Sequence, residues 1–163
     1  MPGTLVSPDT TGATNWPPPS FSPDTGLMYF GTRQTFSVLY LTDTDGRPQG
    51  WAAAERNVGN VGNALKAVDY KTGKVKWSRP FAMGPGGKPG RRRLACSAPP
   101  AVCCSAATAA AISSRYDAAN GKPLWHAGLG TNTSNGPQTY LLDGRQYIVV
   151  GAGDSLCAFV LQQ

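Results

Sequence analysis

An internal repeat constrains the fold of this chain more than any other feature of its sequence. The pattern Asp-x-x-x-Gly-x-x-x-Trp begins at Asp69 and returns 48 residues later at Asp117. Each copy indicates a strand, a tight turn closed by Asp with Gly at positive φ, and a returning strand that carries Trp. A period of this size is typical of blades or solenoid units, in which a hairpin buries its Trp only against a neighbouring unit. The alternative is two unrelated hairpins that share common turn chemistry.

Short apolar runs bounded by turn residues favour an all-β fold. The 163 residues include 20 Gly and 14 Pro, which point to many turns between short elements. Aromatic and β-branched residues gather in runs at 27–32, 37–43 and 146–154, and we expect these runs to form antiparallel strands. After the second repeat, an Asp143-Gly144 turn predicts one further hairpin, followed by a closing strand at 155–161.

The positive charge belongs to one segment of the chain. The net charge is +6, and residues 83–115 hold five cations and no acidic residue. A run of three arginines, 91–93, could bind phosphates, but neither an aromatic platform nor a recognisable nucleic-acid module accompanies it. The sequence therefore predicts a solvated loop and no nucleic-acid partner.

Two further patterns bear on membranes and export. The uncharged run from Leu94 to Ser114 is about as long as a membrane span, but it consists of Ala, Ser, Thr, Cys and a Pro-Pro pair. This composition predicts no transmembrane segment. The first ten residues lack a basic stretch followed by an apolar one, so no secretory signal peptide is visible.

The repeat and two other stretches resemble the quinoprotein alcohol and glucose dehydrogenases, which use pyrroloquinoline quinone (PQQ). The segment Gly12-Ala-Thr-Asn-Trp16 and the strand after it resemble the Asn-Trp segment of that family, and residues 124–159 resemble its last blade. The resemblance covers residues 3–81 and 116–161. It implies that residues 1–163 form an incomplete β-propeller domain, about three blades of an eight-bladed one, from the C-terminal part of such an enzyme.

The resemblance also implies a function and one cofactor contact. Parent enzymes of this kind oxidise alcohols or sugars in the periplasm by hydride transfer to PQQ, with Ca²⁺ beside the quinone. Asn15 matches the residue that contacts the quinone; the alternative is a turn-capping Asn. We expect the Ca²⁺ ligands to lie outside this chain, assign no catalytic and no metal-binding residue in it, and expect it to be inactive alone. The sequence does not indicate the electron acceptor. The alternative function is a non-catalytic propeller scaffold that binds proteins, of the outer-membrane assembly lipoprotein type.

The segment 83–115 departs from the family pattern. The family has a Gly-rich, strand-forming stretch there, whereas this chain has an irregular one in which we expect no strand. When each codon is read from the third base of the one given, Leu94 to Ser114 can encode G-V-L-S-T-A-G-G-L-L-F-S-G-D-G-G-G-N-F-I-A, which leads into Tyr116. The family pattern then reappears. We therefore predict a compensated frameshift in this segment.

Two other candidates for chemistry are weak. Cys103-Cys104 resembles the adjacent-cysteine disulfide of these dehydrogenases, but in the family that pair lies far upstream. Four Cys and one His do not show the paired spacing of a zinc site. His126 could serve as a general base, but no nucleophile motif surrounds it. We therefore expect His126 to be a structural or half-exposed strand residue.

Overall fold

The chain folds into three antiparallel β-sheets that follow one another along the sequence. The computed structural model describes residues 3–15, 19–42, 53–81, 103–108, 112–131 and 136–160. The described residues contain strands and turns but no helix. The first sheet consists of β1 (Thr4–Val6), β2 (Ser20–Ser22), β3 (Leu27–Leu41), β4 (Ala53–Asp69) and β5 (Val75–Pro80). The second consists of β6 (Cys103–Thr108), β7 (Ile112–Asp117) and β8 (Pro123–Gly128), and the third of β9 (Gln138–Leu142), β10 (Arg145–Ala152) and β11 (Ser155–Val160).

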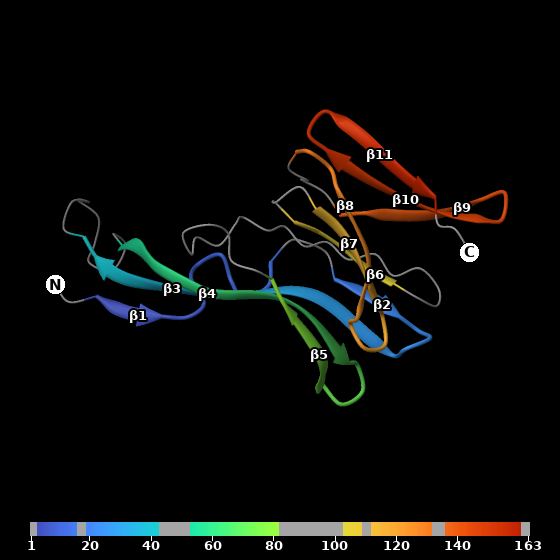
Figure 1. Cartoon of the computed structure of the whole chain (residues 1–163). Helices are drawn as coiled ribbons and strands as arrows, with labels where there is room; N and C mark the ends of the chain where they lie inside the picture. Colours follow the sequence, from blue (N-terminus) through green and yellow to red (C-terminus); the bar gives the residue numbers. More distant parts are fainter. Residues whose placement is uncertain are drawn as a thin grey trace.

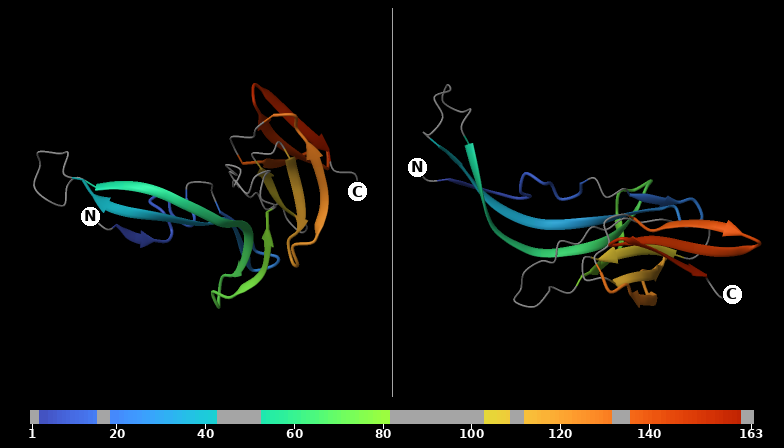
Figure 2. Two further views of the ribbon diagram at one scale, coloured as in Figure 1. Left: turned by 60° about the vertical axis from the view of Figure 1, so that its left-hand side comes forward. Right: turned by 90° about the horizontal axis from the view of Figure 1, so that it is seen from above.

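The first sheet is built on a long two-stranded ribbon. β3 and β4 pair from Leu27↔Asp69 to Leu41↔Ala53. The runs at 27–32 and 37–43, which we expected as strands, are therefore joined in β3. No turn separates them, because the ladder absorbs the irregularity as register shifts at Gln34/Thr35 and Phe36/Ser37. Both views in Figure 2 show this ribbon curving away from the other two sheets.

Both copies of the repeat form the predicted hairpins. β4 turns into β5 through Asp69–Lys74, where the Gly73 N–H donates to the Asp69 carbonyl at 2.8 Å and Gly73 has φ +68°. β7 turns into β8 in the same way, and there the Gly121 N–H donates to Asp117 at 2.7 Å with φ +71°. The Asp side chains accept backbone N–H groups inside their turns. The predicted Asx-type turn with Gly at positive φ is thus confirmed at both positions.

The predicted third hairpin is also confirmed. β9 and β10 are joined at Asp143 and Gly144, whose φ values are +50° and +72°. Positive φ at both central residues is the geometry of a type I′ hairpin turn. β11 then pairs with the other edge of β10, from Tyr147↔Val160 to Ala152↔Ser155, and closes the sheet.

The expectation that residues 83–115 hold no strand is wrong where the structure describes them. β6 occupies 103–108 and pairs with β7 from Cys103↔Asp117 to Thr108↔Ile112. The residues of β6 have little strand propensity of their own, but pairing with β7 satisfies backbone N–H and C=O groups, and this sheet context overrides local preference. Residues 83–102 and 109–111, which include the arginine run, lie outside the described residues.

The sheets pack in sequence order, with the β6–β8 sheet between the other two (Figure 1). Where β4 and β5 meet the second sheet, the core consists of buried Leu27, Tyr29, Leu65, Ala67, Trp77 and Ala118. Between the second and third sheets, Trp125 contacts Phe159 edge to face, with ring centroids 5.0 Å apart. The Trp of each repeat therefore packs against the following unit, as predicted.

Large apolar side chains also remain exposed. Leu141 on β9 is 70% exposed and Leu156 on β11 is 73% exposed.

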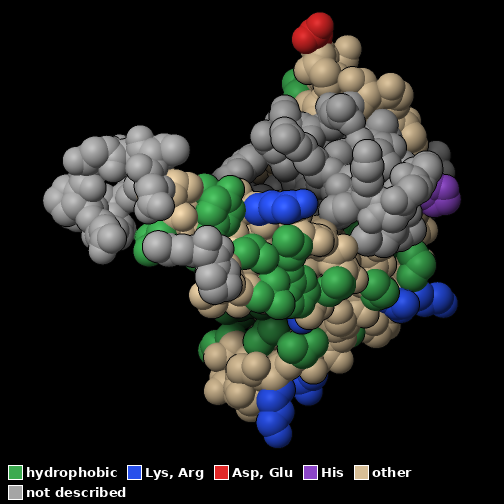
Figure 3. Space-filling view, turned by 90° about the vertical axis from the view of Figure 1, so that its left-hand side faces the viewer, with side chains coloured by type: hydrophobic (Ala, Val, Ile, Leu, Met, Phe, Trp, Pro, Cys, Tyr) green, Lys and Arg blue, Asp and Glu red, His purple; other side chains and the backbone are tan. Residues whose placement is uncertain are grey.

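Figure 3 shows hydrophobic side chains gathered on one face of the molecule, with cationic side chains beside them. Within the part of the chain that the structure describes, no helix is long and apolar enough to span a membrane.

Candidate functional site

The predicted cofactor contact, Asn15, lies in an exposed loop that is anchored on β3. The Gly12 N–H donates to the Asp9 carbonyl at 2.9 Å, and Gly12 adopts φ +79°. At the next residue, the backbone N–H of Arg33 on β3 donates to the Ala13 carbonyl at 2.8 Å. The Asn15 amide N–H₂ donates to the Thr11 carbonyl at 2.6 Å. The Asn15 side chain is exposed, and its hydrogen bond to Thr11 holds it against its own loop. Trp16, the other half of the Asn-Trp pair, lies outside the described residues.

A buried carboxylate, Asp9, organises the base of this loop. Its Oδ1 accepts from the backbone N–H of Thr11 at 3.1 Å and from the Thr11 hydroxyl, and its Oδ2 accepts from the Asn57 amide at 3.3 Å. Its backbone N–H donates to the Thr35 hydroxyl at 3.1 Å. Asp9 is only 8% exposed, so these bonds compensate for removing a charge from water. The network fixes the loop to β3 and β4.

The electrostatics of Asp9 follow from these contacts. Burial acts to raise the pKa of Asp9, but hydrogen bonds from Thr11 and Thr35 and the charge of Arg33 outweigh it and hold the pKa below its ordinary value. Asp9 is therefore an anion that supports the loop, since a proton donor or acceptor for catalysis needs a pKa nearer to neutrality.

A cation lies beside the same loop. The Arg33 guanidinium is 3.7 Å from Asp9 Oδ2, and its side chain is 39% exposed. It thus retains accessible N–H groups next to the segment that carries Asn15. Sequence reasoning missed both Arg33 and Asp9, because neither belongs to a motif and only the pairing of β3 with the loop brings them together. An exposed amide and a partly exposed guanidinium are both donors that suit a ligand with carboxylate or carbonyl oxygens.

Among the described residues, the remaining sequence candidates lie on the second and third sheets, whereas this loop is held on the first. His126 lies exposed on β8, where it pairs with Ser114 of β7. Cys103 and Cys104 occupy successive positions of β6, and Cys157 on β11 is a half-buried free cysteine. The described residues contain no group of three His, Cys, Asp or Glu side chains that could hold a metal ion.

The fold of this chain is similar to part of several solved dehydrogenase structures. A quinohemoprotein alcohol dehydrogenase from Pseudomonas putida superimposes with a TM-score of 0.75 at 21% identity, over 94% of this chain and 24% of that one. The corresponding enzyme of Comamonas testosteroni gives 0.72 at 26% identity, over 92% and 24%. A europium-containing methanol dehydrogenase gives 0.66 at 24% identity, over 90% and 26%. The three sheets therefore have the fold of part of a quinoprotein dehydrogenase propeller, and the predicted fold class is confirmed.

Sequence comparison agrees with the fold. The chain is 32% identical over 162 residues to the quinohemoprotein alcohol dehydrogenase of Comamonas testosteroni. This alignment covers 90% of this chain and 22% of that protein. It is 30% identical over 164 residues to the 1-butanol dehydrogenase (quinone) of Thauera butanivorans, over 91% and 23%. No family model matches. The homologues of this chain are thus quinoprotein and quinohemoprotein alcohol dehydrogenases, and the chain corresponds to a fragment of such a protein.

Proposed function

We propose that this chain is a segment of a PQQ-dependent alcohol dehydrogenase and contributes blades and one cofactor contact to it. The main support is that about nine-tenths of the chain aligns with dehydrogenases of this kind, both in sequence and in structure. The chain spans under a quarter of the length of these relatives, so the activity belongs to the larger assembly. The scaffold alternative is not favoured, because the curated relatives are dehydrogenases.

In this proposal the loop at 12–15 forms part of the wall of the quinone site. Asn15 offers an amide to a carbonyl or carboxylate oxygen of the cofactor, and Arg33 offers a guanidinium that suits its carboxylates. Asp9 keeps the loop and Arg33 together. When bound, PQQ supplies the hydride acceptor for oxidation of an alcohol or sugar, and Ca²⁺ with ligands outside this chain polarises the quinone.

The location and the electron acceptor follow the same proposal. We infer a periplasmic parent enzyme, as the resemblance implies. One relative, from Thauera butanivorans, is a 1-butanol dehydrogenase that uses cytochrome c, and we propose a c-type cytochrome as the acceptor of the parent enzyme. The isolated chain is expected to be inactive, because no catalytic carboxylate is assigned in it.

Equilibrium dialysis of PQQ against the chain, with and without Ca²⁺, tests the cofactor contact. We expect saturable binding that Asn15→Ala and Arg33→Ala each weaken. Gln34→Ala is the matched control, since Gln34 is an exposed amide side chain on the same strand as Arg33. Equal binding by the Asn15→Ala and wild-type chains would remove Asn15 from the site.

A further inference from the structure

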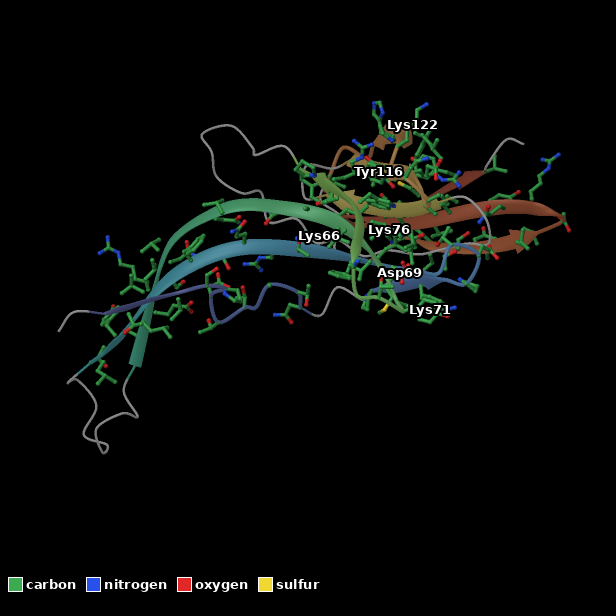
Figure 4. The ribbon with its side chains drawn as sticks, turned by 90° about the horizontal axis from the view of Figure 1, so that it is seen from below. Lys66, Asp69, Lys71, Lys76, Tyr116 and Lys122 are labelled. Atoms are coloured by element: carbon green, nitrogen blue, oxygen red, sulfur yellow. The ribbon has the colours of Figure 1, made fainter. Side chains whose placement is uncertain are left out.

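The hairpin of the first repeat is strongly cationic. Residues 66–79 hold five cations and one acidic residue. Lys71 and Lys74 lie exposed on its turn, and Lys76 lies exposed on β5. The turn of the second repeat adds exposed Lys122, and Figure 4 shows Lys71 at the free end of the first hairpin and Lys122 at the turn of the second. Every lysine among the described residues belongs to one of these two hairpins.

The turns of the two repeats form one surface. The Arg79 Nε–H of the first hairpin donates to the Gly121 carbonyl in the second turn at 2.6 Å. Figure 1 shows both turns at the lower side of the molecule. We call the surface formed by residues 69–76 and Lys122 the cationic rim.

The carboxylates of the two turns do not pair with these lysines. Asp69 Oδ1 accepts from the backbone N–H groups of Lys71 and Thr72, each at 3.0 Å. Asp117 likewise accepts from groups of its own turn. Within the described part of the chain, no lysine forms an ion pair with a carboxylate. Neighbouring cations without such partners create a positive potential that attracts anions.

Apolar side chains lie among the lysines. Tyr70 on the first turn is 54% exposed, and its ring packs edge to face on Phe21, which is 46% exposed, with centroids 5.4 Å apart. Lys71 Nζ lies 5.6 Å from the centroid of the Tyr70 ring. Val75, at the start of β5, is also exposed. Tyrosine rings are enriched at membrane interfaces, where they lie at the level of the headgroups and lysines reach the charged groups above them.

The choice of cation distinguishes between anionic partners. Protein interfaces are enriched in arginine, which binds carboxylates through two parallel hydrogen bonds, and are depleted in lysine. The cations of the rim are all lysines, which are compact point charges on flexible stems. Such charges suit a diffuse anionic surface, on which no fixed bonding geometry is required. The rim therefore favours a lipid surface over an acidic protein.

We propose that the cationic rim is a peripheral binding surface for a bilayer that contains anionic phospholipids. Lys71, Lys74 and Lys122 contact the phosphate headgroups, and the rings of Tyr70 and Phe21 lie at headgroup depth. The rim does not include the loop of the proposed cofactor contact, so the two proposals can fail separately.

Flotation of the full chain with vesicles in a sucrose gradient tests the proposal, because bound protein rises with the lipid whereas aggregated protein sinks. We expect the chain to float with vesicles of phosphatidylglycerol and phosphatidylcholine, but not with phosphatidylcholine alone. Added NaCl should reduce the bound fraction, because salt screens exposed charges.

Two pairs of variants locate the binding surface. Lys71→Gln with Lys122→Gln should weaken binding roughly twentyfold, since each lysine near an anionic surface contributes about fivefold. Arg56→Gln with Arg145→Gln is the matched control: it removes the same charge from exposed positions outside the rim, and binding should stay within about twofold. Tyr70→Gln should also weaken binding, at low and at high salt. Its control is the same change at Tyr140, a tyrosine exposed on β9.

Four results would overturn the proposal. The first is the absence of flotation with anionic vesicles. The second is that same absence together with retention on immobilised polyglutamate that the lysine variant loses, which would identify an acidic protein as the partner. The third is an equal loss in both charge variants, which would mean that net charge alone drives binding. The fourth is unchanged flotation of the lysine variant, which would assign binding to the arginine run at 91–93. Circular dichroism of all variants checks that the strands remain.

Discussion

Replacing Gly121 with Ala should weaken the contact between the first and second sheets more than the same change at Gly73. Both glycines have nearly equal φ, +71° and +68°, so the backbone strain of a Cβ is alike and costs roughly 1–2 kcal/mol at each position. At Gly121 the new Cβ would also overlap the Trp77 ring, with a separation of 2.6 Å, whereas Gly73 has open space. Overpacking of this kind costs about 1–3 kcal/mol. The extra loss at Gly121 should therefore be about 1–3 kcal/mol.

Urea unfolding of the chain at low concentration, followed by Trp fluorescence, measures this difference. The two variants share the residue change and the turn type, so their difference in the free energy of unfolding isolates the docking of Trp77. An equal loss in both variants would refute the reasoning, because it would mean that Trp77 does not lie on the second turn.

Three further predictions concern other parts of the chain. Ser113→Ala should stabilise the chain by about 1 kcal/mol, because the Ser113 hydroxyl is buried without a hydrogen-bond partner among the described residues; urea unfolding checks this, with Ser78→Ala on exposed β5 as the control. Because the folded-state pKa of Asp9 is lowered, its contribution to stability is present above the unfolded-state value near 3.9 and is lost as the pH falls through the folded-state pKa. Asp9→Asn should therefore flatten the acid limb of the stability curve; an unchanged acid limb would contradict this. Leu141→Lys with Leu156→Lys should reduce concentration-dependent self-association in light scattering, since both side chains are exposed on the two edge strands of the third sheet. Unchanged association would exclude these two side chains as its cause.

The local chemistry of the turns made the repeat hairpins and the third hairpin predictable. Asp and Gly at fixed offsets define each turn, and a Trp on the returning strand needs a neighbour to bury it. The sequence also predicted Asn15 as a cofactor contact, by resemblance, and this stays a prediction. The contacts that hold the loop of Asn15 in place were not predictable, since Asp9 and Arg33 meet only because the loop lies against β3.

Sheet context explains where the sequence misled. β3 joins two runs that we expected as strands, because its partner β4 pairs along its whole length. β6 forms in a stretch of weak strand formers because β7 offers an open edge to pair with. Local propensity carries neither kind of information.

The predicted frameshift gains a structural argument from β7. Ser113 and Arg115 each hold a buried polar side-chain atom that has no partner among the described residues, and they lie two positions apart on one strand. Residues at this spacing share a face of the sheet. Counted back from Tyr116, the shifted reading places Phe at the position of Ser113 and Ala at the position of Arg115. Both polar side chains would therefore be replaced by apolar ones. This substitution pattern suits a buried face.

Sequencing the DNA across codons 80–120 and its flanking regions, read in all three frames, tests the central claim most directly. If the chain is a segment of a quinoprotein alcohol dehydrogenase, the shifted frame will encode the Gly-rich strand, and the flanking DNA will encode further Asp-x-x-x-Gly-x-x-x-Trp repeats together with Ca²⁺-binding carboxylates. If neither the strand nor the repeats are present, the cysteine pair and the arginine run are genuine features of this protein, and the dehydrogenase account is wrong.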